Sequence, residues 1–426
     1  MNIGIIGSGA GCISILKHLL QYKCQLSSIL IFSKDHNQVG FAYKDVPEVF
    51  IMNTRLDSLT QFNDVIGITD WLTAKKYNYC DNDYLPRRVY GAYLQDVKYN
   101  LIDQLKKTGI VVHTYGKADY LDEDGNIICN GICFKTDASV LAIGFGKDIL
   151  NDHLFDRIAS LPYGGTIDVY GSGLTSIDIL LYIYTYRPDL KMQCYSLSGR
   201  FPRVRGKFKA GGASIFDDYN ETIPSFNSII QLFKSLVTKD IEKYILFNPL
   251  CALKDEVEYC SAYTPIWQER LYNGTMNYLD FYQKLGRDDQ VLLHNIRHQF
   301  IETRAMFPLV NARKLATLID DGQLSILSRR YDPTTVNKNS ILAFNPIMDL
   351  EIIQMSRLPM HSISGVDVDR NCKVNDKRNI YVLGPMTNGS RFFTEATSLT
   401  VRDAKLIVDA LIISKEGQTH ELVRYC

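Results

Sequence analysis

The chain has 426 residues, more than one ordinary hydrophobic core accommodates, so at about 150 residues per domain we expect two or three domains. A hydrophobic content of 46% with 22% charged residues is typical of a folded globular protein and excludes a disordered one. Lysine plus arginine (47) balances aspartate plus glutamate (47), so no overall electrostatic field favours nucleic acid or an anionic membrane as the partner.

The N-terminal residues lack the features of a targeting segment, because Met1 and Asn2 lead directly into the apolar run 3–6. No run of about 20 apolar residues is present, so no membrane-spanning helix is expected. The ten cysteines form no Cys-x-x-Cys pair, and His294 and His298, four residues apart, lack the glutamate of a zinc-protease motif. We therefore expect a cytoplasmic protein with reduced thiols and no bound metal.

Two segments of the chain have the pattern of a strand–helix–strand unit. In the first, apolar runs at 3–6 and 29–32 flank apolar residues at helical spacing over 13–20. The second has an expected strand at 166–170, a helix at 176–184 and a strand at 192–196. Such units favour an α/β fold with parallel sheets.

The remaining segments complete this picture in chain order. A loop-rich stretch ends in a helix over 90–105, and 222–325 has a mainly helical pattern before a last helix over 401–413. Further strands are expected at 110–113, 127–129, 138–143, 325–327, 341–344 and 379–384.

The first unit joins its strand to its helix through the glycine-rich run 7–12. Gly7 permits a tight turn, and Gly9 allows close approach of a pyrophosphate whose charge lies at the helix N-terminus. Cys12 occupies the usual third glycine position and is small enough for helix–strand packing. Ser33 stands where an acidic residue usually binds the ribose. The run predicts a dinucleotide site, with an ordinary glycine turn as the alternative.

The second unit has a similar loop, in which Gly171 and Gly173 precede Leu174 and Thr175 at the start of a helix. No acid closes the next strand, which is followed instead by Ser198, Arg200 and further basic residues up to position 209. Serine and arginine suit a 2′-phosphate, which favours NADPH over NADH. The alternatives are a loop that no longer binds a nucleotide and a basic loop that is merely solvated.

These and other motifs resemble the two-dinucleotide flavoproteins, which include flavin-containing and N-hydroxylating monooxygenases. The chain is especially similar to a bacterial group of FAD/NAD(P)-binding proteins. The similarity covers nearly the whole chain and rests on the order and spacing of the segments 39–43, 51–53, 86–94, 137–144, 171–178, 198–203 and 384–389, followed by Arg402.

The resemblance implies a Rossmann-type α/β fold in which two sheets and a set of helices form three layers (ββα). It also implies two dinucleotide-binding domains and a helical insert. The FAD domain would comprise residues 1–160 and 331–426, and the NAD(P) domain 161–330 with the insert at 222–325. Arg87 would lie near the flavin or its phosphates, and Gly384 and Met386 beside the isoalloxazine. The predicted cofactor contacts are Gly7, Gly9, Ala10, Gly11, Cys12, Ser33, Asn53, Arg87, Ala118, Gly144, Gly171, Gly173, Leu174, Thr175, Ser198, Arg200, Gly384 and Met386.

The implied activity is that of an FAD-dependent NAD(P)H oxidoreductase, a monooxygenase that acts on a small amine or another small metabolite. Such chemistry needs no protein nucleophile, and neither a Gly-x-Ser-x-Gly nor a His-Glu-x-x-His motif is present, so no catalytic side chain is predicted. Two alternatives remain open. One is an FAD-dependent oxidase or dehydrogenase that does not use NADPH, and the other is a non-enzymatic redox sensor or scaffold.

Overall fold

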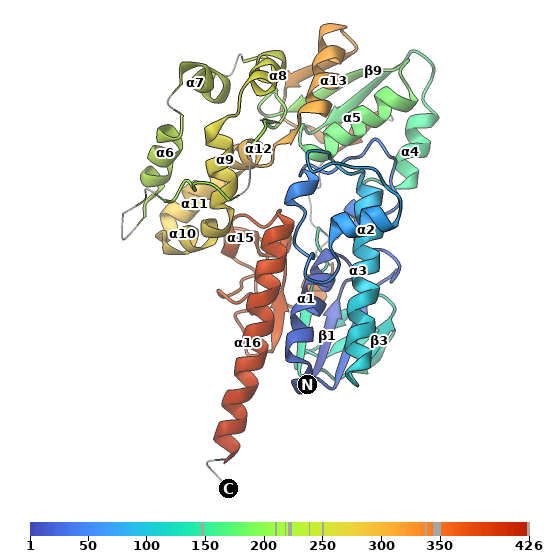
Figure 1. The fold of residues 1–426 in the computed structure, drawn as a ribbon, viewed down its shortest axis with the longest axis vertical. Helices are drawn as coiled ribbons and strands as arrows, with labels where there is room; N and C mark the ends of the chain where they lie inside the picture. Colours follow the sequence, from blue (N-terminus) through green and yellow to red (C-terminus); the bar gives the residue numbers. More distant parts are fainter. Residues whose placement is uncertain are drawn as a thin grey trace.

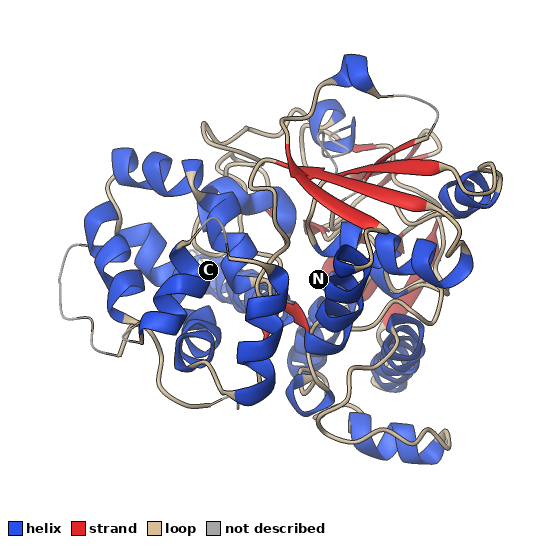
Figure 2. Cartoon of the chain, turned by 90° about the horizontal axis from the view of Figure 1, so that it is seen from above, coloured by secondary structure: helices blue, strands red, loops and turns tan. Residues whose placement is uncertain are grey.

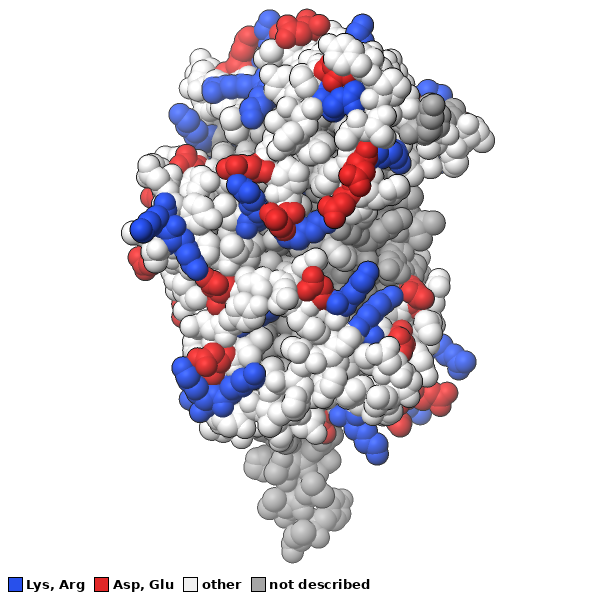
Figure 3. All heavy atoms as spheres, turned by 90° about the vertical axis from the view of Figure 1, so that its right-hand side faces the viewer, with Lys and Arg blue, Asp and Glu red and all other residues white. Residues whose placement is uncertain are grey.

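The computed structural model describes residues 1–145, 149–208, 211–217, 219, 224–237, 239–248, 251–336, 339–343 and 351–423. Two parallel sheets and a group of helices make up the molecule, with the second sheet above the first in Figure 1 and the helical group beside both. Figure 3 shows acidic and basic side chains interspersed on one face, consistent with the balanced composition. Of the helices that the structure describes, none is both long and apolar enough to cross a membrane.

The first sheet has five strands in the order β14-β7-β1-β2-β3, and every neighbouring pair is parallel. Strand β1 is central because its Ile3 and Ile5 are fully buried and pair on both sides. Continuous apolar strands of this kind are expected in a parallel sheet covered on both faces. The strands are β1 (Asn2–Ile6), β2 (Ser28–Phe32), β3 (Val111–Tyr115), β7 (Ala138–Leu141) and β14 (Ile380–Val382).

Three long helices cover one face of this sheet: α1 (Ala10–Leu19), α3 (Arg87–Lys107) and α16 (Thr397–Val423). The other face packs against a small antiparallel sheet formed by β4 (Tyr120–Leu121), β5 (Ile127–Cys129) and β6 (Ile132–Phe134). The first sheet, these helices and the small sheet together form the first unit of the chain. Its three layers confirm the predicted Rossmann-type arrangement. The short helices α2 (Ile68–Ala74) and α14 (Glu351–Met355) add buried apolar side chains to the two sides of this layered core.

The second sheet has four parallel strands in the order β12-β9-β8-β13. Its strands are β8 (Thr166–Tyr170), β9 (Lys191–Ser196), β12 (Leu324–Ser328) and β13 (Ser340–Leu342), and its helices are α4 (Asp152–Ala159), α5 (Leu174–Tyr186) and α13 (Leu309–Asp320). The second sheet and these helices form the second unit of the chain. This second unit extends past both boundaries of the predicted NAD(P) domain, at 160 and 330. The reason is that β13 pairs with β8, and Leu154 and Ile158 of α4 pack in the same core. Phe344 of the expected strand 341–344 lies outside the described residues.

Seven of the helices in the described part of the insert lie together, and Figure 2 shows them on one side of the strands. A short parallel pair, β10 (Val204–Arg205) with β11 (Phe307–Pro308), joins the two ends of the insert. His294 and His298 lie on different helices, because the chain leaves helical geometry around Ile296. The helices are α6 (Phe226–Ser235), α7 (Asp240–Phe247), α8 (Leu253–Ala262), α9 (Ile266–Asn273), α10 (Tyr278–Lys284), α11 (Arg287–Asn295) and α12 (Arg297–Arg304).

Candidate functional site

The turn between β1 and α1 admits only glycine at its first position. Gly7 has a φ of +114°, and a Cβ atom there would lie 2.4 Å from the Ala142 carbonyl oxygen. Its N–H donates to the Phe32 carbonyl at 2.8 Å, which ties the turn to the end of β2. Gly9 lies so close to the next loop that an added Cβ would be 3.3 Å from the Gly40 Cα. The turn is thus built from backbone at close range, as the sequence pattern predicts.

The N-terminus of α1 is open to an anion. No side chain caps Gly9, and the first turn contains no acidic residue, so the N–H groups at residues 9–11 carry the positive end of the helix dipole uncompensated. Gly11 gives the close helix–strand packing, since an added Cβ would be 3.1 Å from the Ala142 Cβ. The Cys12 side chain is fully buried, and burial raises the pKa of its thiol to about 12. Only the backbone of Cys12 therefore remains for a ligand.

Ser33 stands at the carboxyl end of β2, beside the first glycine loop. Its hydroxyl lies 2.9 Å from that of Ser8, and both hydroxyls donate to the Asp35 carbonyl oxygen. Lys98 supports this loop from α3, because its Nζ donates to the His36 carbonyl at 2.6 Å. Burial lowers the pKa of this ammonium. Sequence reasoning missed Lys98, although a lysine on the apolar face of an expected helix was a usable signal.

Two glycines leave open space at the carboxyl ends of neighbouring strands. Gly144 follows β7 with a φ of +62°, and Gly384 follows β14 with a φ of +93°. No heavy atom lies within 4 Å of a Cβ added at either position. Met386 is buried below this edge, and its carbonyl accepts the Val366 N–H at 2.7 Å. The free space above the two glycines suits a flat group that approaches the backbone closely.

Asn53 and Ala118 differ in what they offer to a ligand. The Asn53 side chain is half-buried, and its amide has no hydrogen-bond partner among the described residues, so it is available to a ligand. Ala118 lies in the apolar core between the first sheet and the small antiparallel sheet. Its methyl group packs there and does not face open space.

Arg87 joins the two units of the chain. It is the first residue of α3, and its Nη2 lies 2.8 Å from Oδ2 of Asp178 in α5, while its Nε donates to the Ile51 carbonyl at 3.1 Å. Both side chains are largely buried. Burial raises the pKa of Asp178 to about 6, and the charge of Arg87 opposes this rise. In this conformation the arginine bridges the two units, and no exposed ion pair is involved.

The second glycine loop repeats the construction of the first. Gly171 has a φ of +106° and donates to the Tyr195 carbonyl at 2.7 Å, as Gly7 does to Phe32. Gly173 precedes α5 as Gly9 precedes α1, and no atom lies within 4 Å of a Cβ added there. Leu174 and Thr175 then begin α5, whose first turn is uncapped and has no acidic residue. Each sheet thus ends in an equivalent open helix N-terminus.

Basic residues gather where β9 and β12 end side by side. The Arg200 guanidinium has no hydrogen-bond or ion-pair partner among the described residues, and the Ser198 hydroxyl donates to Glu302 at 2.9 Å. Arg329 and Arg330 follow β12, and the Arg329 N–H donates to the Ser196 carbonyl at 2.8 Å. These two arginines were missed, because β12 is far from β9 in sequence and the pairing is visible only in the fold.

The other basic residues of the loop after β9 differ in whether they are buried and paired. Arg203 is buried, pairs with Glu256 at 3.5 Å and donates to the Leu246 carbonyl at 3.0 Å, so it serves the structure of the insert. Lys207 is exposed, and position 209 lies outside the described residues. Within the described chain, no group of three or more histidine, cysteine, aspartate or glutamate side chains is placed to hold a metal ion.

Comparison with known protein families bears directly on the first unit. Residues 4–146, which contain the first glycine loop, match the model of a family described as FAD-NAD(P)-binding. Residues 4–146 form an FAD/NAD(P)-binding domain. No curated protein matches the chain significantly.

Several solved structures are similar in fold to nearly the whole chain, and not only to residues 4–146. An ornithine N-hydroxylase from Kutzneria sp. 744, with reduced FAD, NADP⁺ and L-ornithine in its title, matches with a TM-score of 0.52 at 12% identity, over 97% of this chain and 99% of its own. The FAD-bound cadaverine monooxygenase of Erwinia amylovora matches with a TM-score of 0.52 at 12% identity, over 96% and 94%. The ornithine hydroxylase of Pseudomonas aeruginosa matches with a TM-score of 0.50 at 10% identity, over 96% and 98%. At these identities the likeness is one of fold.

Proposed function

We propose that the protein is an FAD-dependent NAD(P)H oxidoreductase, a monooxygenase that acts on a small amine or another small metabolite. The observation that carries the proposal is the pair of glycine loops with matching hydrogen bonds, each placed before an uncapped helix without acidic residues. A single such loop serves one dinucleotide, whereas two serve an enzyme that transfers a hydride between two cofactors. The similar solved structures are named as ornithine hydroxylases and a cadaverine monooxygenase, which supports a monooxygenase that acts on a small amine.

The first unit fits FAD. The backbone N–H groups of Gly9, Ala10, Gly11 and Cys12 would hold the pyrophosphate, and the Ser33 hydroxyl the ribose. The open space beside Gly144 and Gly384 would receive the isoalloxazine, with Asn53 as a free amide for its polar edge. Bound FAD would accept a hydride from the nicotinamide and, once reduced, activate oxygen.

The second unit fits NADPH. The first turn of α5 would hold the pyrophosphate at Gly171, Gly173, Leu174 and Thr175. Ser198 and the unpaired Arg200 would bind the 2′-phosphate, helped by Arg329 and Arg330 on the neighbouring strand end. The protein's own part in catalysis is to bind and orient both nucleotides and to exclude water, and the Arg87–Asp178 pair fixes one unit against the other.

An anaerobic absorbance spectrum of the purified chain loaded with FAD tests the proposal. We expect NADPH to bleach the flavin rapidly and NADH more slowly. Retained flavin that neither nucleotide reduces would contradict the proposal and indicate an oxidase or dehydrogenase that takes the hydride from its substrate. If neither nucleotides nor small amines and metabolites bleach the flavin, a sensor or scaffold becomes the better reading. Oxygen consumption with NADPH and small amines then tests the monooxygenase step.

A further inference from the structure

Two buried arginines face the same aromatic ring at the junction of the helical insert and the first unit. Arg205 of β10 is 5% exposed and Arg304, the last residue of α12, is 7% exposed. Their guanidinium carbons lie 5.1 Å and 4.9 Å from the centre of the Tyr272 ring. Arg205 also lies 4.6 Å from the Phe208 ring and Arg304 5.4 Å from the Phe393 ring. Aromatic faces therefore surround both cations.

Neither arginine has a carboxylate partner among the described residues. The Arg205 side chain makes no hydrogen bond or ion pair there, and Arg304 donates from Nη2 to the Thr275 hydroxyl while its Nε stays buried without a partner. Asp57 acts on Arg205 electrostatically, but it is engaged by Arg55 at 2.7 Å. The junction therefore holds two buried positive charges that the protein itself leaves uncompensated.

This arrangement is costly for the unliganded protein. Burial lowers the pKa of Arg205 and of Arg304, and the positive charges of Arg55 and Arg205 respectively add to the shift. The rings offset part of the desolvation cost, but they do not replace the hydrogen bonds that guanidinium groups lose on burial. Uncompensated buried charges of this kind are characteristic of binding sites, where the ligand supplies the opposite charge.

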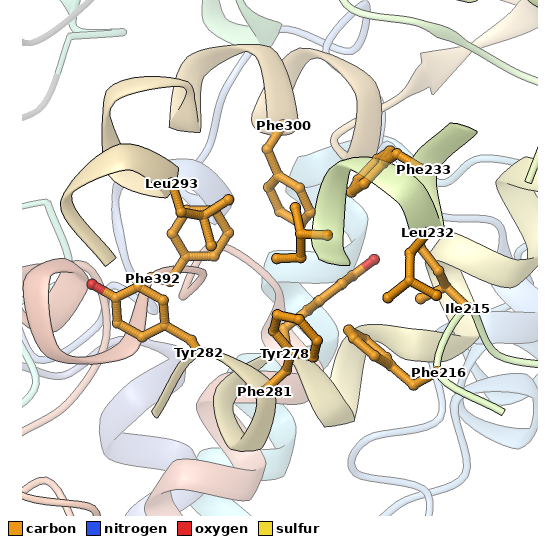
Figure 4. A pocket seen from close by; sticks show the side chains of 11 residues that line it. Ile215, Phe216, Leu232, Phe233, Tyr278, Phe281, Tyr282, Leu293, Phe300 and Phe392 are labelled. Atoms are coloured by element: carbon orange, nitrogen blue, oxygen red, sulfur yellow. The ribbon is translucent and has the colours of Figure 1, made fainter. Parts of the chain in front are cut away.

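The interior of the insert nearby is already filled. Figure 4 shows the aromatic side chains of Tyr278, Phe300 and Phe392 pointing toward one another around a cavity, and this cavity has room for no more than about one water molecule. A ligand of the arginine pair therefore does not enter this apolar core.

We propose that Arg205 and Arg304 form the binding site of a small carboxylate. A carboxylate supplies the negative charge that both guanidinium groups lack, and charge-assisted hydrogen bonds between a guanidinium and a carboxylate are short and strong. A phosphate would need further donors, and both Arg55 and Thr275 are already engaged. The assignment of this carboxylate to the substrate rests on the proposed function, whereas the binding itself does not.

Thermal unfolding of the FAD-loaded full chain with glutarate or glutaramide as the probe tests the site. The two molecules share a carbon chain and differ in charge, and a ligand that binds the native state raises the melting temperature. We expect glutarate to raise it and glutaramide to leave it unchanged. Arg205→Met and Arg304→Met should each abolish the rise, and Arg205→Lys should weaken glutarate binding at least tenfold. Arg370→Met is the control, because Arg370 is exposed and pairs with Asp280.

The unliganded variants supply a second readout. Methionine keeps an apolar side chain on the rings and removes the charge, so Arg205→Met without glutarate should melt at or above the temperature of the unchanged protein. A much lower melting temperature together with retained glutarate binding would overturn the site and assign both arginines to structure. Stabilisation by inorganic phosphate and not by glutarate would overturn the carboxylate class. Flavin bleaching by NADPH is measured separately, so failure of the proposed function and failure of this site are distinguishable.

Discussion

Glycine at position 7 is required for two separate reasons: its positive φ and its contact with the Ala142 carbonyl. We expect Gly7→Ala to cost about 1–3 kcal/mol of unfolding free energy and to reduce FAD retention. Gly173→Ala is the matched control, because that residue has a φ of −71° and open space around its Cβ position. It should change stability by no more than about 0.5 kcal/mol and weaken only the second nucleotide. Urea unfolding and flavin content measure both effects, and equal losses in the two variants would contradict this account.

Asp178 makes stability depend on pH in a defined window. Burial raises its folded pKa from 3.8 to about 6, so the carboxyl favours the folded state while it is protonated. Its contribution is fully present below pH 3.8 and is lost as the pH rises through about 6. Between pH 4 and 7 the unfolding free energy should therefore fall by about 3 kcal/mol more in the unchanged protein than in Asp178→Asn. The same pH dependence in both proteins, measured by denaturant unfolding, would rule this out.

At the scale of elements, the proposed selectivity for NADPH depends on the ends of β9 and β12 together. Arg200 follows β9 and has a free guanidinium, so Arg200→Gln should lower the rate of flavin bleaching by NADPH relative to NADH by about 10–100-fold. The reason is that a charge-assisted hydrogen bond to the 2′-phosphate is lost, whereas NADH makes no such contact. Arg313→Gln on α13, an exposed arginine bonded to Ser261, is the control. An unchanged NADPH to NADH ratio would show that Arg200 is only solvated.

The helices that follow the two glycine loops were predictable because their signals are local. Apolar spacing and the glycine runs predicted α1 and α5 close to their observed bounds, and the positive φ of Gly7 and Gly171 follows from the same runs. The boundaries of the second unit were not predictable in the same way. A strand was expected at 341–344, but the local pattern does not say which sheet it joins, and β13 belongs to the second sheet because it pairs with β8.

At the scale of the whole molecule, the Arg87–Asp178 ion pair couples the two units. Arg87→Ala would leave the buried Asp178 without its partner, so we expect a loss of about 3–5 kcal/mol at pH 7. The neighbouring Arg88 is the matched control, because it forms an exposed pair with Glu48, and Arg88→Ala should cost about 0–1 kcal/mol. Unfolding by urea at pH 7 measures both. Similar losses in the two variants would show that Arg87 has no special role in joining the units.

The amino-acid sequence was sufficient to predict the class of fold and the positions of the two glycine loops. These features depend on residues that are neighbours along the chain: alternating apolar runs, helical spacing, and glycines where the backbone must turn or approach a ligand. Ser33 comes directly after a recognisable strand and Arg200 four residues after another, and their roles in nucleotide binding stay predictions.

Contacts between side chains that are far apart in the sequence became apparent only from the tertiary structure. Arg87 lies opposite Asp178, Arg329 follows the strand beside β9, and Arg205 and Arg304 both lie against the Tyr272 ring, although long stretches of sequence separate the members of each set. The physical reason is that burial and pairing of a charge depend on the packing of whole elements, and one-dimensional spacing does not contain that information. Which charged side chains of this protein are buried, and which are paired, therefore depends on its tertiary fold.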